Sequence, residues 1–174
     1  MLTLQQFDTR LFARVFRQGR NSAPVYRAAK IVSRSGDGYL HLLLPAMLAG
    51  AGSTLLPQYC VLLGSAMFFE RLVYWVMKNT LRRRRPQDLV PGIRSIIKAS
   101  DQFSFPSGHT SAAFCLATCT GIVLGGPFAA LYLWACSVAL SRVLLGVHFP
   151  GDTVAGGLIG SAIAVLTAGQ LGLL

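Results

Sequence analysis

Charged residues are scarce in this chain of 174 residues. Only 13% of the residues are charged, 53% are hydrophobic, and the mean hydropathy is +0.53. Ordinary soluble domains carry roughly 25% charged residues. The composition therefore excludes an ordinary soluble domain and predicts an integral membrane protein, which we interpret as a single domain over residues 1–174.

Cysteine is equally sparse, with Cys60, Cys115, Cys119 and Cys136 all inside apolar runs. Cys115 and Cys119 are one helical turn apart, but no clustered histidine or second cysteine pair completes a zinc pattern. We interpret all four as small packing residues. The N-terminus lacks the continuous apolar stretch of a signal peptide, because arginine interrupts it repeatedly.

The sequence also lacks a basic stripe with interleaved stacking aromatics, which argues against a nucleic-acid partner despite a formal net charge of +10. Its basic residues instead lie between apolar runs, where they anchor a protein to lipid headgroups. We assign Arg82, Arg83 and Arg84 to such anchoring.

Apolar periodicity predicts an all-α, polytopic membrane helical bundle over residues 37–174. Pro57 is interpreted as a turn, and the loop at 82–104 as a functional loop or lid. Residues 1–36 have a basic and an apolar helical face, which is typical of amphipathic helices in the membrane interface. The five predicted spans are residues 39–56, 58–81, 107–124, 128–147 and 150–171.

Two features inside the predicted spans concern packing. Glu70 and Arg71 are costly at membrane depth, so we expect them to face the bundle, neutralising each other or pairing with neighbouring helices. Gly156, Gly157 and Gly160 share a face of the last span with other small residues, which permits close helix contact.

Five spans that alternate in direction place three polar clusters on one side of the membrane. Lys78 and Arg85 close the second span, Pro-Ser-Gly-His at 106–109 opens the third, and the segment 141–152 joins the fourth to the fifth. Motifs far apart in sequence thus meet at one surface, which indicates a functional site.

Each cluster suits an anion. Pro106 is expected at the first position of a helix, where Ser107 and Gly108 would offer free backbone N–H groups and a hydroxyl, with His109 at the rim. Lys78 and Arg85 lie seven residues apart, about two helical turns, and could point to the same side.

The third cluster combines Arg142, His148 and Asp152. A carboxylate four residues after a histidine can bond one ring nitrogen and leave the other as a nucleophile or base. Three cations and a helix start fit a phosphoryl group. Asp152 is the only carboxylate in the constellation, which disfavours a two-metal cage and favours a nucleophilic histidine with no metal or other cofactor.

Together these residues resemble the three-part signature of the type 2 phosphatidic acid phosphatase superfamily, over residues 78–152. The resemblance implies that His148 attacks phosphorus to form a phosphohistidine, that Asp152 orients His148, and that His109 protonates the leaving oxygen and then activates water. It also implies phosphate-binding residues that need no metal: Lys78, Arg85, Ser107, Gly108 and Arg142.

The resulting hypothesis is a lipid phosphatase in the bacterial inner membrane, acting on phosphatidate, phosphatidylglycerophosphate or undecaprenyl diphosphate. Alternatives are a lipid A phosphatase, a lipid phosphotransferase, or a small lipid or anion transporter. All basic residues other than Arg71 and Arg142 fall on the site side, so the positive-inside rule favours a cytoplasmic site over a periplasmic one. The oligomeric state stays open.

Overall fold

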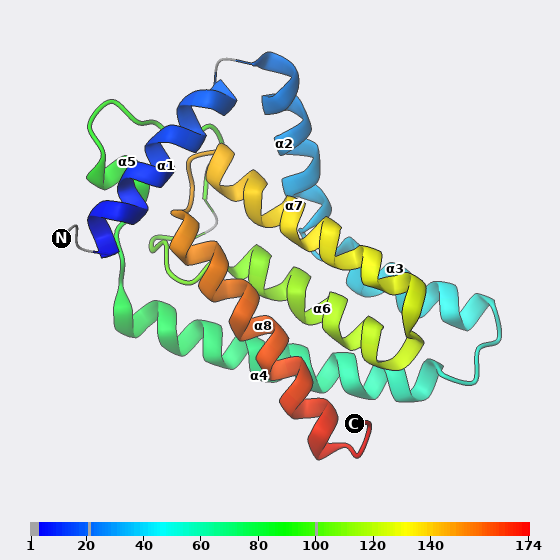
Figure 1. Ribbon diagram of the computed structural model, residues 1–174. Coiled ribbons are helices and arrows are strands. Elements are labelled where there is room, and N and C mark those ends of the chain that lie inside the picture. Colours follow the sequence, from blue (N-terminus) through cyan, green and yellow to red (C-terminus); the bar gives the residue numbers. More distant parts are fainter. Residues whose placement is uncertain (1–3, 21, 100) are drawn as a thin grey trace.

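The described part of the chain is helical, with connecting turns and loops (Figure 1). A computed structural model describes residues 4–20, 22–99 and 101–174, and it confirms the all-α prediction. The elements are α1 (Leu4–Arg20), α2 (Ala23–Ser35), α3 (Tyr39–Gly50), α4 (Leu56–Leu81), α5 (Pro86–Leu89), α6 (Gly108–Leu124), the 3₁₀ helix η1 (Gly126–Ala129), α7 (Ala130–Leu144) and α8 (Pro150–Gln170).

Three described segments are long and apolar enough to cross a membrane: Leu56–Leu89, Gly126–Leu144 and Pro150–Gln170. The apolar helices α3 and α6 have 12 and 17 residues. At 1.5 Å per residue, α3 covers only about 18 Å of a hydrocarbon core about 30 Å thick. The membrane setting is therefore supported, while the count of five spans stays a prediction.

Two predicted helix boundaries were wrong. Pro57 does not form the turn; it lies in the first turn of α4, where its missing N–H removes no helical hydrogen bond. The turn occupies residues 51–55 instead, so α3 ends earlier than the predicted span. Pro106 lies before α6, which begins at Gly108 with Ser107 as its N-cap residue.

Helix α6 runs through the middle of the bundle and packs most closely on α8. A Cβ atom built on Gly160 would lie 2.0 Å from the carbonyl oxygen of Ser111, and one on Gly156 would lie 2.6 Å from that of Ser107. Only glycine allows this approach, so the small-residue face of α8 serves packing within the monomer, as predicted.

The cysteines divide into two classes. Cys115 and Cys119 are fully buried in the core with Tyr59, Leu62 and Leu116, as expected for packing residues. Cys60 and Cys136 are exposed, so the prediction that all four pack inside the bundle was wrong for these two.

The amphipathic helix α1 packs against the bundle. Phe12 and Phe16 are buried on Val143 and Phe149, and the rings of Phe12 and Phe149 lie 5.4 Å apart. Leu4 and Phe7 remain exposed on the same helix. Residues 1–3 of the predicted amphipathic segment lie outside the described residues.

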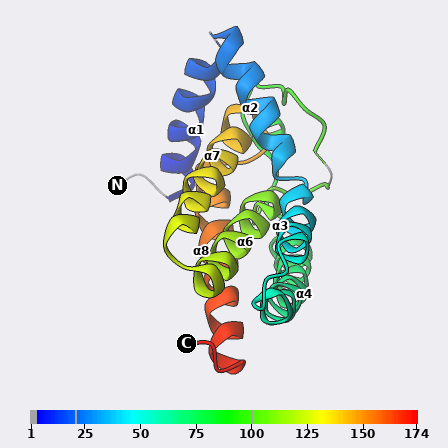
Figure 2. The ribbon, with the colours of Figure 1, turned by 90° about the vertical axis from the view of Figure 1, so that its right-hand side faces the viewer.

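The chain reverses direction from α3 to α4, from α4 to α6, and again at each later helix. The end of α4, the start of α6, the end of α7 and the start of α8 therefore lie at the same end of the bundle (Figure 1). Seen from the side, α3 and α4 lie next to each other, while α1 and α2 cover the end of α7 (Figure 2).

Candidate active site

His148 is buried in the turn between α7 and α8, and its two ring nitrogens have different surroundings. Nδ1 lies 2.7 Å from the carbonyl oxygen of Ser104. A carbonyl can only accept, so Nδ1 carries the proton and Nε2 keeps its lone pair. The expected bond from Asp152 is not formed, because Asp152 Oδ2 lies 3.7 Å from Nδ1 and instead accepts from the backbone N–H of Phe149 at 2.8 Å. Asp152 therefore acts on His148 through its charge and by fixing the turn.

Burial lowers the pKa of His148 to about 4. The nearby guanidinium groups of Arg142 and Arg85 act in the same direction, and Asp152 opposes them. The imidazole is consequently neutral at physiological pH, as a nucleophile must be.

This pKa has a consequence for stability. The unfolded chain, with an ordinary histidine pKa near 6.5, binds the proton first as the pH falls, so His148 should destabilise the fold progressively between about pH 6.5 and 4, by about 3 kcal/mol in all. We expect the melting temperature of the wild type, relative to a His148→Gln variant, to fall over that interval. A constant difference from pH 7 to 4 would contradict a depressed pKa.

Arg83 binds Asp152 from behind the site, contrary to the prediction that it only anchors lipid headgroups. Its Nη1 lies 2.6 Å from Asp152 Oδ1 and its Nη2 lies 2.6 Å from Asp8 on α1. The guanidinium also sits 4.3 Å from the ring centroid of Phe149. Arg83 thereby connects α1 to the start of α8 and neutralises a fully buried carboxylate.

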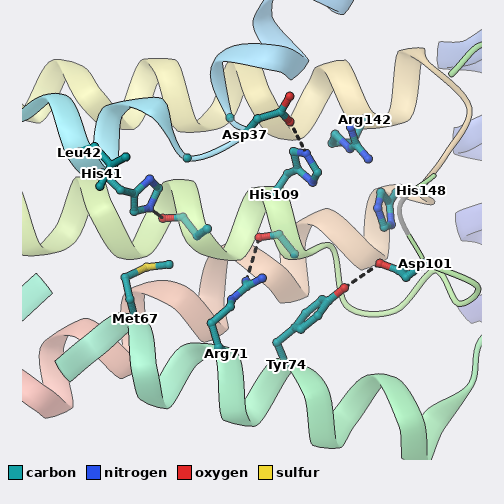
Figure 3. Close-up of a pocket in the computed structure, with 14 residues that line it drawn as sticks. Asp37, His41, Leu42, Met67, Arg71, Tyr74, Asp101, His109, Arg142 and His148 are labelled. Atoms are coloured by element: carbon teal, nitrogen blue, oxygen red, sulfur yellow. Dashed lines mark hydrogen bonds and ion pairs between the residues drawn. The ribbon is translucent and has the colours of Figure 1, made fainter. Parts of the chain in front are cut away.

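His109 lies at the rim, in the first turn of α6, with a carboxylate partner that the sequence did not suggest. Its Nε2 is 2.8 Å from Asp37 Oδ1 (Figure 3). Asp37 belongs to the glycine-containing turn between α2 and α3, and 43% of its side chain is exposed. Burial and the charge of Arg142 disfavour protonation of His109, and the contact with Asp37 opposes them in part while it fixes the orientation of the imidazole.

Lys78 and Arg85 converge on one carboxylate, that of Asp101. Lys78 Nζ lies 3.0 Å and Arg85 Nη2 lies 2.6 Å from Asp101 Oδ1, and the Tyr74 hydroxyl donates to Oδ2 at 2.7 Å. Burial opposes ionisation of Asp101, but the Tyr74 hydrogen bond and the two cations outweigh it and hold its pKa at about 2. Arg85 is fixed further by a 2.6 Å bond to the carbonyl of Val147, beside His148.

Arg142 is buried near the two histidines with donors to spare. Its Nη1 donates to Ser33 at 2.7 Å, whereas Nε has no hydrogen-bond partner among the described residues. A buried charged donor without a partner is costly, so this guanidinium is placed for an anion.

The start of α6 offers fewer free donors than predicted. The N–H of Ser107 is already bonded to the carbonyl of Asp152 at 3.0 Å, and its hydroxyl lies 3.0 Å from that of Thr110. Gly108 has a structural reason to lack a side chain, since a Cβ atom there would meet the Tyr74 ring at 2.8 Å. The anion-binding groups at the start of α6 are therefore limited to the N–H groups from Gly108 onward and the Ser107 hydroxyl.

Several of these groups border a cavity of about 520 Å³ between α3, α4, α6 and α7 (Figure 3). His109, His148, Arg142 and Asp101 all line it, whereas Lys78 and Arg85 lie behind Asp101. The structure thus brings every predicted site residue to one end of the bundle. It adds contributors that sequence reasoning missed: Asp37, Tyr74, Arg83, Asp101 and Ser104.

For the two missed carboxylates, Asp37 and Asp101, the available signal was the scarcity of acidic residues. The chain has only six acidic residues, and each of them except Asp88 contacts a basic side chain at or next to the site. Among the described residues, no three His, Cys, Asp or Glu side chains gather as metal ligands.

Comparison with known proteins identifies the family. Residues 58–172 match the model of the PAP2 superfamily. The chain is 28% identical over 138 residues to decaprenylphosphoryl-5-phosphoribose phosphatase of Mycobacterium tuberculosis, covering 79% of this chain and 76% of the relative. It is 32% identical over 147 residues to phosphatidylglycerophosphatase B of Bacillus subtilis, covering 69% of each protein.

Two solved structures share the fold. The crystal structure of Aquifex aeolicus LpxE matches with a TM-score of 0.76 and 25% identity over 92% of this chain and 93% of the other. A PAP2-type phosphatidylglycerolphosphate phosphatase from Bacillus subtilis matches with a TM-score of 0.73 and 21% identity, over 97% and 86% of the two chains. The three motifs meet at one end of the bundle, and the family match and the shared fold agree with them: the chain belongs to the PAP2 superfamily.

Proposed function

We propose that this protein is a membrane phosphatase that hydrolyses a phosphate ester or diphosphate on a lipid. The observation that carries the proposal is the neutral, buried imidazole of His148 beside Arg142 at one cavity, with Lys78 and Arg85 held by Asp101, which also lines it. Three cations near a nucleophile suit a transferring phosphoryl group, whose charge spreads over its equatorial oxygens. Relatives named as phosphatases of decaprenylphosphoryl-5-phosphoribose and phosphatidylglycerophosphate support a lipid substrate.

In the proposed reaction, Nε2 of His148 attacks phosphorus and the bond to the lipid oxygen breaks. His109 gives its proton to the leaving oxygen and then takes one from the water that hydrolyses the phosphohistidine. Arg142, the α6 N-terminus with Ser107 and Gly108, and Lys78 and Arg85 would bind the phosphoryl oxygens. Asp37 and Asp152 position the two imidazoles.

The test is phosphate release by purified protein from a panel of lipids: phosphatidate, phosphatidylglycerophosphate, undecaprenyl diphosphate and lipid A. We expect release to persist in EDTA, because the described carboxylates of the site are already paired with basic side chains. No release from any of these lipids would refute the proposal, and appearance of a phosphorylated acceptor alcohol would favour the phosphotransferase alternative. Transport of an intact lipid without cleavage would favour the transporter.

The proposal requires Asp101 to yield. Its carboxylate forms ion pairs with Lys78 and Arg85, and it lies between these cations and the cavity. An Asp101→Asn variant should therefore bind orthovanadate roughly tenfold more tightly, since a charge-assisted hydrogen bond contributes about 1.5–3 kcal/mol and each 1.4 kcal/mol is tenfold. Inhibition titrations of phosphate release measure this. Weaker inhibition would mean that Asp101 holds the two cations in position.

We further propose that the site faces the cytoplasm. Seven Lys and Arg residues lie between positions 10 and 34 and seven between 78 and 98, on the segments that gather at the site end. A cysteine introduced at Arg82, an exposed position at the end of α4, should resist an impermeant thiol reagent in intact cells once the native cysteines are replaced. Labelling in intact cells would place the site on the periplasmic face.

A further inference from the structure

The cavity continues past the two histidines toward the apolar part of the bundle. Its far side is lined by Leu42 on α3, Met67 on α4 and Ala112 on α6 (Figure 3). Leu42 is largely exposed on the outer surface of the bundle, so this end leads toward the acyl chains. The portion of a lipid substrate between the scissile phosphate and the tail would occupy this region.

Arg71 lies along this route and takes no part in the chemistry described above. Its Nη2 is 3.3 Å from the carbonyl of Gly108, at the start of α6. Its guanidinium carbon is 4.5 Å from the Tyr74 ring centroid, and Lys78 Nζ is 4.7 Å from the same centroid. The two cations are therefore within about 9 Å of each other, joined through one aromatic ring.

The charge of Arg71 is held in place by its neighbour Glu70. Glu70 is fully buried, and its two carboxylate oxygens accept from Nε and Nη2 of Arg71. Nη1 has no hydrogen-bond partner among the described residues, and 45% of the side chain is exposed at the cavity. The pair makes a cation tolerable at this depth and leaves one face of the guanidinium for a ligand.

A second polar group at the same level also lacks a partner. His41, on α3, contacts the carbonyl of Ala112 through Nε2 at 3.2 Å. Its Nδ1 is buried and unpaired among the described residues. Because the carbonyl of Ala112 can only accept, Nε2 carries the proton and Nδ1 keeps its lone pair, so a hydrogen-bond donor of a ligand, such as a hydroxyl, would satisfy it at this level of the cavity.

We propose that Arg71 binds a second phosphoryl group of the substrate, on the tail side of the scissile phosphate. This deepens the proposed function and depends on it: the substrate would be a lipid with two phosphoryl groups. Phosphorus atoms joined through one oxygen or through a three-carbon alcohol lie about 3–7 Å apart, since each bond of a bridge adds about 1.2 Å. Both separations lie within the upper limit of about 9 Å between the two cations, so the shared chemistry is a second phosphate.

The test compares three lipids presented at equal surface concentration: phosphatidate with one phosphate, phosphatidylglycerophosphate with a phosphodiester, and undecaprenyl diphosphate. We expect an Arg71→Gln variant to lower the ratio of kcat/KM for a two-phosphate lipid to that for phosphatidate by at least tenfold, mainly through KM. Arg71→Lys should restore part of that ratio. Whether the phosphodiester or the diphosphate loses more identifies which of them the site fits.

Two further variants separate binding from folding and from surface charge. Arg71→Gln alone leaves Glu70 buried without its partner, so a Glu70→Gln/Arg71→Gln double variant removes both charges together and should show the same lowered ratio. Arg94→Gln removes one positive charge from an exposed loop position outside the cavity and should leave the ratio unchanged.

An unchanged ratio in the Arg71 variants would overturn the inference and leave Arg71 as the partner of Glu70 only. Equal kcat/KM of the wild type for all three lipids would overturn it without any variant. Both results differ from a wild type that releases no phosphate at all, which would refute the proposed function itself.

Discussion

Replacing His148 with alanine should reduce phosphate release by at least about 10⁴-fold, because removing an enzyme's nucleophile abolishes the covalent route and leaves only the binding groups. The imidazole is neutral at working pH and its Nδ1 is fixed by Ser104, so Nε2 presents a lone pair to the cavity. The variant keeps Lys78, Arg85 and Arg142. Orthovanadate should therefore still bind, although less tightly, since it loses its bond to nitrogen.

The covalent step can be observed directly. Brief incubation of the wild type with substrate labelled in the phosphate, followed by alkaline quench, should leave acid-labile label on the protein, and His148→Ala should carry none. Val147→Ala is a matched control, because Val147 is fully buried next to His148 and its truncation should cost about 2 kcal/mol of packing without removing the imidazole. Phosphate release by a folded His148→Ala protein at a rate near the wild type's would exclude His148 as nucleophile.

The helices of this fold were largely predictable because apolar runs interrupted by Gly and Pro define them. The boundary around Pro57 was not, since proline fits equally a turn and the first turn of a helix. Pro106 posed the same ambiguity and was resolved the other way, outside α6. Such cases are decided by tertiary packing, here the close contact of α6 with Gly156 on α8.

The site was predictable where its chemistry is local in sequence, as in the segment from Arg142 to Asp152. The partners that tune this chemistry come from elsewhere: Asp37 reaches His109 from 72 residues away, and Ser104 reaches His148 from 44. From the sequence alone, Asp37 in its glycine-containing turn predicts only the end of a helix; its contact with His109 depends on the tertiary fold. Arg83 shows the reverse error, because one member of a run of four arginines looked like surface charge but neutralises buried Asp152.

Replacing His109 with alanine should reduce hydrolysis of a lipid phosphate by about 10²–10⁴-fold, the usual contribution of a positioned general acid. For a phosphate ester of a lipid alcohol, such as phosphatidate, the leaving group is an alkoxide, which needs a proton as the bond to phosphorus breaks. An aryl phosphate such as p-nitrophenyl phosphate releases a stable phenolate instead. The substitution should therefore slow phosphorylation of His148 by the aryl phosphate far less than phosphorylation by the lipid. Pre-steady-state release of nitrophenol measures the rate with the aryl phosphate.

The second half of the reaction gives the sharper result, because the same imidazole is expected to activate the hydrolytic water. In the His109→Ala variant, the aryl phosphate should produce a burst of nitrophenol and an accumulating phosphoenzyme, since dephosphorylation becomes slow. Asp37→Asn keeps the ring and removes only its carboxylate partner, so it should give a smaller loss and shift the basic limb of the rate profile to lower pH, because the imidazolium loses a favourable charge. Equal losses with both leaving groups and no accumulation would assign His109 to substrate binding and remove it from proton transfer.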